Sequence, residues 1–337
     1  MGFDDILGNG RVKKILRLAL VKNRLPGSLL FHGPEGVGKR RLALALAKAV
    51  NCERKKDDAC DECPVCLAIA GGRFPDVQEI KPSGQVIKVE HVREMRQVAT
   101  MRPMTGRKRV FIISEADQMN EESSNTVLKI LEEPPPFSLF ILVTDKVHLL
   151  LSTIRSRCQA LQFGPVGKEA IAGALREKGF GEDEARIVSL FVGGNLEEAL
   201  KLDWDNIQQA RREAWGLLVS LAKPEEPSRF LRSYGFAQRN VIRKDLEKTL
   251  GIMASFCRDM ALIKEGGDAS LLFNPDFEAE YRALEGFWSP ERGQHFLRLI
   301  DGAIAGLAKN LNMSLIASAF YSFLGESAHD RDHLSRF

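Results

Sequence analysis

The stretch Gly33-Pro34-Glu35-Gly36-Val37-Gly38-Lys39-Arg40 decides the fold. It follows the apolar run Ser28-Leu29-Leu30-Phe31-His32 and precedes an Ala/Leu-rich stretch at 42–50, an order that predicts strand, glycine loop and helix. Glycines let successive backbone N–H groups turn towards an anion, and the following helix adds its dipole. The sequence therefore predicts a phosphate-binding loop, in which Gly33, Gly36, Gly38 and Lys39 contact phosphate. The alternative is an ordinary glycine turn before a helix, and the flanking elements favour the loop.

Two positions that hold Mg²⁺ in an intact NTPase carry other residues here. The residue after the loop lysine is normally Ser or Thr, whereas Arg40 has no acceptor for a metal. The predicted buried strand at 109–113 should end in an Asp that holds the metal, and Ser114 stands there instead. Glu115 fits the next position, which orients the attacking water, or is a solvated carboxylate at a strand end. Because hydrolysis needs the metal, the sequence predicts weak or absent nucleotide binding and no hydrolysis.

Four cysteines lie close together in a C-x7-C-x2-C-x2-C pattern, namely Cys52, Cys60, Cys63 and Cys66. In a chain without an apparent signal peptide, clustered thiols favour a metal over disulfides. Four thiolates surround a tetrahedral Zn²⁺ and leave no position for water. We therefore expect one structural zinc ion. An iron–sulfur cluster and free buried thiols are the alternatives.

Composition predicts a soluble globular chain of two or three domains. The 337 residues are 44% hydrophobic and 28% charged, and no apolar run approaches the length of a membrane span. The N-terminus lacks a signal-peptide pattern, so a cytoplasmic protein without membrane contact is expected. The formal charge is only +3, so any contact with nucleic acid would have to come from a local basic patch or through a complex. The basic stretch at 93–109 is either such a patch or a solvated helix and turn, with equal weight.

The remaining patterns predict an α/β part followed by a helical part. Helices are expected at 12–20, 90–98 and 125–131, the last stopped by Pro134, and strands at 86–89 and 139–144. After Pro165 no further apolar strand pattern occurs. Near the end, Leu297, Ile300, Ile304, Leu307 and Leu311 form one apolar stripe of a long helix.

The order of these motifs resembles that of bacterial clamp-loader subunits of the AAA+ class. The resemblance rests on the glycine loop, the cysteine cluster, Ser114-Glu115-Ala116-Asp117, the run Leu128-Lys129-Ile130-Leu131-Glu132-Glu133-Pro134-Pro135 and Ser156-Arg157-Cys158. It implies a RecA-like α/β AAA+ domain with a parallel sheet at 1–165, including a zinc-binding insert at 52–66. A small helical lid at 166–205 and an all-α collar domain at 206–337 would follow.

The resemblance also implies roles for two further residues. Arg157 would be an arginine finger that reaches the ATP site of a neighbouring subunit, although a surface arginine after a strand is the simpler alternative. Within Gly194-Asn195-Leu196-Glu197-Glu198-Ala199-Leu200, Glu197 stands where ATPase members carry a sensor arginine. A carboxylate at that position would repel phosphate.

These implications describe a subunit of the DNA polymerase III holoenzyme without ATPase activity of its own, although the family is grouped with the DNA-directed DNA polymerase activity of that assembly. Such a stator would help to load the sliding clamp on primed DNA during replication. Its partners would be the delta and gamma/tau subunits of a hetero-pentamer, with the clamp and primer-template DNA reached through the complex. The main alternative is an active clamp-loader ATPase. A zinc-dependent DNA-binding protein is weaker, because the cysteine cluster lacks the histidines and recognition helix of a finger.

Overall fold

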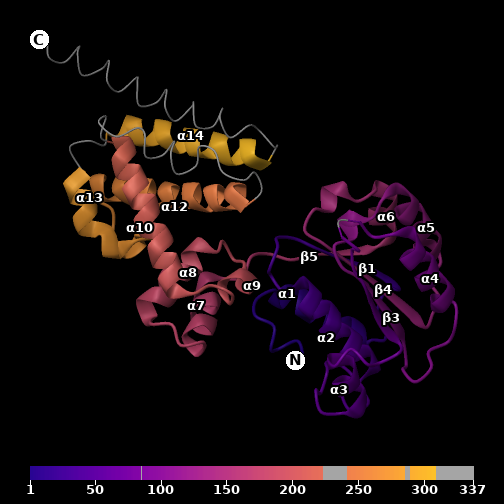
Figure 1. The fold of residues 1–337 in the computed structure, drawn as a ribbon. Helices are drawn as coiled ribbons and strands as arrows, with labels where there is room; N and C mark the ends of the chain where they lie inside the picture. Colours follow the sequence, from indigo (N-terminus) through magenta and orange to yellow (C-terminus); the bar gives the residue numbers. More distant parts are fainter. Residues whose placement is uncertain (85, 223–240, 285–288, 309–337) are drawn as a thin grey trace, which may run out of the picture. The chain divides into compact units, whose positions relative to one another are not determined.

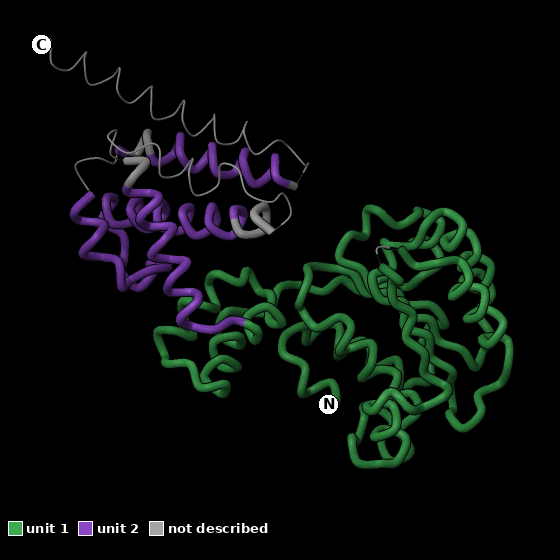
Figure 2. Tube along the Cα trace, in the orientation of Figure 1, with its two compact units in different colours: residues 1–201 green, residues 202–337 purple. Residues whose placement is uncertain are grey.

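The computed structural model describes residues 1–84, 86–222, 241–284 and 289–308. The chain forms two compact units, residues 1–201 and 202–337, which Figure 2 distinguishes by colour. The first unit contains the whole expected AAA+ domain and most of the segment expected to form a lid. The expected division into three parts, with boundaries after residues 165 and 205, remains a prediction.

A five-stranded parallel sheet forms the centre of the first unit (Figure 1). Its strands are β1 (Ser28–His32), β2 (Val77–Ile80), β3 (Arg109–Ile113), β4 (Ser138–Thr144) and β5 (Gln159–Gln162), arranged in the order β2-β3-β4-β1-β5. Strands β3 and β4 are buried along their whole length, as parallel strands covered on both faces should be. Phe111 pairs with Phe140 across them, and the two rings stack at 5.3 Å. The predictions for β1, β3 and β4 are confirmed.

The strand expected at 86–89 is wrong. Val86 and Ile87 form only isolated bridges, to Ser83 and Met119, and helix α4 (Val89–Ala99) begins immediately afterwards. The N–H of Ile87 donates to the carbonyl of Gln118 at 2.9 Å, outside the sheet. Two strands of the sheet were not predicted, namely the edge strand β2, whose four residues showed no apolar run in the sequence, and the edge strand β5 at the opposite side of the sheet.

Helices cover both faces of the sheet. Figure 1 shows α1 (Gly10–Val21) and α2 (Lys39–Asn51) on one side, and α4 and α5 (Glu121–Glu132) on the other. The short helices α3 (Pro64–Ala70) and α6 (Ser152–Arg157) pack on α2 and α5, respectively. The main core lies between the sheet and α4, α5 and α6, where Leu30, Phe111 and Phe140 are each at most 1% exposed.

The rest of the described chain is helical, as expected. The first unit ends with α7 (Lys168–Glu177), α8 (Glu182–Phe191) and α9 (Leu196–Ala199). The second unit contains α10 (Trp204–Ala222), α12 (Val241–Lys264), α13 (Glu278–Leu284) and α14 (Pro290–Ala308). The buried face of α14 includes Ile300 and Leu307 of the expected stripe, whereas Leu311 lies outside the described residues.

Candidate nucleotide-type and metal sites

The glycine loop has the shape of a phosphate-binding loop. Gly33, Gly36 and Gly38 all have positive φ, at 140°, 69° and 91°, and α2 begins at Lys39 directly after them. A Cβ on Gly33 would lie 2.3 Å from the carbonyl oxygen of Phe163, so only glycine fits there. The loop thus joins the end of β1 to the N-terminus of α2, as its sequence predicts.

A cavity of about 500 Å³ opens beside the loop and brings most of the predicted site residues together. Its lining includes six of them: Gly36, Gly38, Lys39, Arg40, Ser114 and Glu115. The charged residues around it are Glu35, Lys39, Arg40, Arg41, Glu115, Asp117, Asp145, Lys146 and Glu197. Carboxylates outnumber cations in this lining, which opposes the binding of a polyphosphate anion.

The loop lysine is engaged within the chain. Lys39 is 5% exposed, and its ammonium donates to the carbonyl of Gly33 at 2.7 Å and to that of Pro34. It also forms an ion pair with Asp145 at 2.5 Å. Asp145 directly follows β4, and sequence reasoning missed it. The rule that the carboxyl ends of parallel strands meet at one edge of the sheet could have found it.

Arg40 and Ser114, which replace the usual metal-binding residues, both bind the carboxylate of Glu79. The guanidinium of Arg40 binds Glu79 at two points, of which Nη2 to Oε2 measures 2.6 Å. The hydroxyl of Ser114 donates to Oε1 of Glu79 at 2.8 Å. Burial raises the pKa of Glu79, but the hydrogen bonds from Arg40 and Ser114 bring it below its usual range. Glu79 lies on β2, one of the two strands that were not predicted from the sequence.

The N-terminus of α9 contacts the glycine loop. The backbone N–H of Glu197 donates to the carbonyl of Gly36 at 3.2 Å. A Cβ on Gly36 would lie only 1.5 Å from Oδ1 of Asn195, which itself caps α9 by accepting from the N–H of Glu198. Glu197 lines the cavity beside this contact. The segment expected to carry the sensor position therefore does lie at the loop, with a carboxylate in it.

Arg157 is not among the residues that line this cavity. It is the last residue of α6, and its side chain is 34% exposed. Nη2 and Nε donate to Oε1 of Glu132 at 2.6 and 3.0 Å, and Nη1 donates to the carbonyl of Thr153 at 3.0 Å. Glu132 occurs in the run Leu128–Pro135 that the sequence singled out, but its contact with Arg157 was not foreseen.

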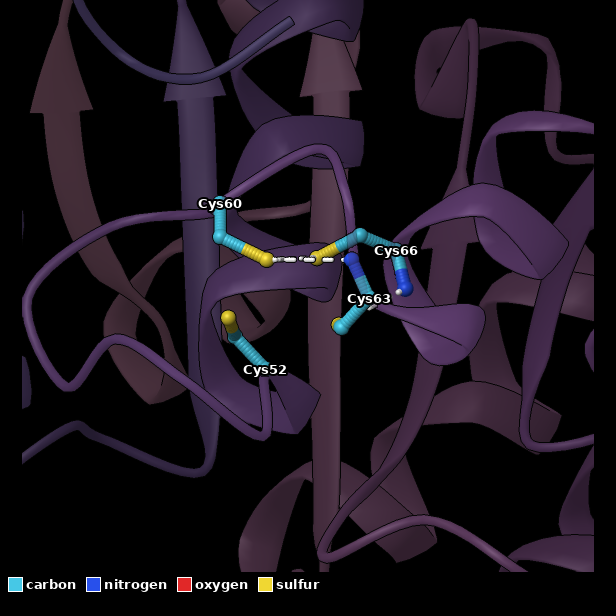
Figure 3. A group of neighbouring side chains, drawn as sticks. All are labelled: Cys52, Cys60, Cys63 and Cys66. Atoms are coloured by element: carbon cyan, nitrogen blue, oxygen red, sulfur yellow. Dashed lines mark hydrogen bonds between the residues drawn. The ribbon is translucent and has the colours of Figure 1, made fainter.

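The four clustered cysteines converge, as Figure 3 shows, with all four Sγ atoms within 4.8 Å of one another. Cys52 caps the end of α2, Cys60 lies in the loop that follows, and Cys63 and Cys66 stand at the start of α3. Sulfurs on a tetrahedral Zn²⁺ with bonds of about 2.3 Å lie about 3.8 Å apart, so small adjustments suffice for binding. This cluster can hold a metal ion such as zinc.

The surroundings of the sulfurs suit thiolate ligands. Backbone N–H groups of Lys55, Cys63 and Cys66 donate to the sulfurs of Cys52, Cys60 and Cys63, respectively, at 3.3–3.4 Å. Such bonds, first of all from Glu62, lower the pKa of Cys60 to about 6. Burial raises the pKa of Cys66 to about 12, and a bound cation would offset this effect.

In the basic stretch at 93–109, fewer positive charges are exposed and unpaired than the sequence suggests. Arg109 is 4% exposed and pairs with Asp76 at 2.9 Å, so it belongs to the interior. Arg93 pairs with Glu122 at 2.7 Å. Three further arginines of this stretch are exposed, namely Arg96, Arg102 and Arg107. Contact with DNA remains a prediction.

In the part of the chain that the structure describes, we find no helix with the length and apolar character needed to cross a membrane.

The sheet order, the glycine loop after β1 and the acidic segment after β3 define a P-loop domain of the AAA+ class. Residues 8–167 match the family model "DNA polymerase III, delta subunit". The DNA polymerase III subunit delta' of Bacillus subtilis (strain 168) is 30% identical over 270 residues, which cover 80% of this chain and 82% of that one. The chain belongs to the DNA polymerase III delta-prime family of clamp-loader subunits.

Two other similarities are more partial. The tau subunit of B. subtilis DNA polymerase III is 34% identical over 207 residues, which cover 59% of this chain but only 37% of tau. Among solved structures, a gamma subunit-related protein of Thermotoga maritima aligns over 93% of this chain and 97% of its own, with 17% identity and a TM-score of 0.49.

Proposed function

We propose that this clamp-loader subunit does not hydrolyse ATP and acts as a stator while the loader places the sliding clamp on primed DNA. The observation that carries this proposal is the contact of Arg40 and Ser114 with the same carboxylate, Glu79. In an intact NTPase these two positions hold the Mg²⁺ that bridges the β- and γ-phosphates. Here the guanidinium of Arg40 and the hydroxyl of Ser114 both bind Glu79, so neither of these two positions offers a ligand to a metal.

The same proposal gives Arg157 the role of an arginine finger for a neighbouring ATPase subunit. The partners are the delta and gamma/tau subunits of a hetero-pentamer, with the clamp and primer-template DNA contacted through the assembly. Supporting this role, Arg157 ends a short helix, is one-third exposed and lies outside the lining of this chain's own cavity. A guanidinium in such a place can stabilise charge that develops on phosphate bound to another chain.

The cysteine cluster is proposed to hold one structural zinc ion. Four sulfur donors complete a tetrahedral shell, so no open position remains for a reacting water. The cluster has a small core of its own, in which Cys52, Cys63 and Cys66 pack with Ala59. The ion would hold the insert at 52–66 folded, a contribution to stability and not to catalysis.

An active ATPase is the second candidate, and one observation favours it. The positive-φ glycines and the buried Lys39 preserve the shape of a working phosphate loop. The shape of the loop indicates phosphate binding, but it does not indicate hydrolysis. Backbone amides and lysine bind phosphate without Mg²⁺, whereas hydrolysis needs the metal. The two candidates therefore differ in Mg²⁺-dependent turnover.

ATP hydrolysis by the purified chain, alone and in the assembled loader, separates these candidates. We expect no Mg²⁺-dependent turnover by the chain alone, whereas a rate typical of AAA+ ATPases that Lys39→Ala abolishes would overturn the proposal. In the assembled loader, Arg157→Ala should lower DNA-stimulated hydrolysis and leave assembly intact. Arg155→Ala, two residues away on the same helix, is the matched control. A normal rate with Arg157→Ala, together with a lowered rate with Arg155→Ala, would show that the arginine finger is not Arg157.

A further inference from the structure

Arg157 is held by groups from two helices. Its Nε and Nη2 donate to one oxygen of Glu132, the last residue of α5, and its Nη1 donates to the carbonyl of Thr153 in α6. These three hydrogen bonds restrain the guanidinium on two sides. The plane of the guanidinium is thereby set by the packing of α6 on α5.

Two N–H groups of Arg157 take no part in these three hydrogen bonds. An arginine side chain has five N–H groups, one on Nε and two on each terminal nitrogen. Glu132 takes one from Nε and one from Nη2, and Thr153 takes one from Nη1. One N–H is left on each terminal nitrogen, and a guanidinium can engage two oxygens of a phosphate with one N–H from each terminal nitrogen. The side chain is 34% exposed, so a ligand from outside can approach it.

From this geometry we propose that Glu132 is a positioning residue for Arg157. Its carboxylate fixes the guanidinium so that the remaining terminal N–H pair faces an anion on the neighbouring subunit. This inference rests on the proposed finger role of Arg157 and deepens it. The ligand is a phosphate oxygen pair of the neighbour's nucleotide, and Glu132 itself does not contact it.

Stability alone is a poor explanation for the pair. Glu132 is 50% exposed and Arg157 34% exposed, and ion pairs between exposed side chains contribute little to stability. Glu132 also stands at the C-terminus of α5, where the helix dipole disfavours a carboxylate. What the pair does supply is a fixed orientation, and small misplacements of a catalytic group cost large factors in rate.

The test uses the assembled loader with substitutions in this chain. Glu132→Ala should lower the kcat of DNA-stimulated ATP hydrolysis by roughly tenfold or more, with little change in KM, because the neighbour's own site binds the nucleotide. Glu132→Gln keeps an acceptor oxygen in place and should retain most of the rate. Glu132→Asp keeps the charge but withdraws the acceptor, so it should resemble Glu132→Ala. Glu133→Ala changes the adjacent exposed glutamate and serves as the matched control.

A double substitution tests whether the two residues act together. Glu132→Ala combined with Arg157→Ala should be no slower than Arg157→Ala alone, since positioning is useless without the group that is positioned. Size-exclusion chromatography and thermal melting of each variant report whether the chain folds and assembles. A normal rate with Glu132→Ala, together with a lowered rate for Arg157→Ala, would overturn the positioning role alone. A normal rate with Arg157→Ala would overturn the finger and the positioning role together.

Discussion

Arg40 and Glu79 form a two-point ion pair between the start of α2 and strand β2, with Nη2 2.6 Å from Oε2. A positively charged side chain, the guanidinium of Arg40, thus occupies the position at which an intact NTPase carries a residue that binds a metal ion. The ion pair joins the loop helix to the edge of the sheet without nucleotide or metal.

Restoring the metal ligands should restore Mg²⁺-dependent nucleotide binding. In the double variant Arg40→Thr, Ser114→Asp, a hydroxyl and a carboxylate replace the guanidinium and the serine. We expect affinity for a nucleotide to become roughly tenfold tighter with Mg²⁺ than with EDTA, a difference of about 1.4 kcal/mol. Fluorescent-nucleotide titration measures this ratio, which should be close to one for the unaltered chain.

Arg41→Thr is the control for this experiment, because Arg41 also lines the cavity and its replacement removes the same charge. It should show no Mg²⁺ dependence. If the double variant binds nucleotide no better with Mg²⁺ than without it, the altered residues at positions 40 and 114 do not explain the loss of metal binding.

Removing one sulfur ligand should release the metal and loosen the insert. Cys63→Ser is expected to lower the zinc content from one ion per chain towards zero and to lower the melting temperature, because binding energy at a structural site is folding energy. Elemental analysis and calorimetry measure the two effects. Cys158→Ala, outside the cluster, should keep the zinc. Iron with a visible charge-transfer band in the unaltered chain would contradict the zinc assignment.

Loss of the metal should also destabilise the N-terminal segment, which is hydrogen-bonded to the insert. Asp58, inside the insert, accepts hydrogen bonds from the N–H of Phe3 at 2.9 Å and from Arg17 at 2.8 Å. Phe3 is fully buried. Hydrogen exchange at residues 3–6 should therefore become faster in Cys63→Ser, and unchanged exchange there would show that the segment is held independently of the insert.

Asp76 should make the stability of the first unit depend on pH below about 4. Burial raises the pKa of Asp76, but hydrogen bonds from the backbone of Met104, Thr105 and Gly106 and from Arg109 lower it to about 2. A lowered pKa in the folded state means stability that is present above the unfolded value of 3.8 and lost as pH falls towards 2. This contribution is on the order of 2 kcal/mol.

Urea unfolding between pH 7 and pH 2 tests this dependence. Asp76→Asn should lower the free energy of unfolding at pH 7 by about 3 kcal/mol, because buried Arg109 loses its counter-ion. Its curve should then fall less steeply than that of the unaltered chain between pH 4 and pH 2. Asp57→Asn changes an exposed aspartate and should leave the curve unchanged. Parallel curves for Asp76→Asn and the unaltered chain would contradict the prediction.

Several features could be predicted from the sequence because each depends on neighbouring residues. The loop at 33–40, the strands at 28–32, 109–113 and 139–144 and the cysteine cluster are all local patterns of spacing and apolar runs. The sequence also shows directly that positions 40 and 114 carry Arg and Ser in place of the usual metal-binding residues. Strands β2 and β5 were missed because both are short edge strands with mostly polar or exposed residues, such as Gln78 and Glu79 in β2, and neither has an apolar run.

What only the tertiary structure decided is which residues meet across the chain. Glu79 lies 39 residues from Arg40, and Glu132 lies 25 residues from Arg157. Parallel strands are joined by long crossovers, so residues that meet at one edge of the sheet come from distant segments whose order in space the sequence does not state. The sequence by itself therefore determined that Arg40 cannot hold a metal and that Arg157 is a candidate finger. The packing of β2 beside β3, and of α6 on α5, decided the partner of each guanidinium.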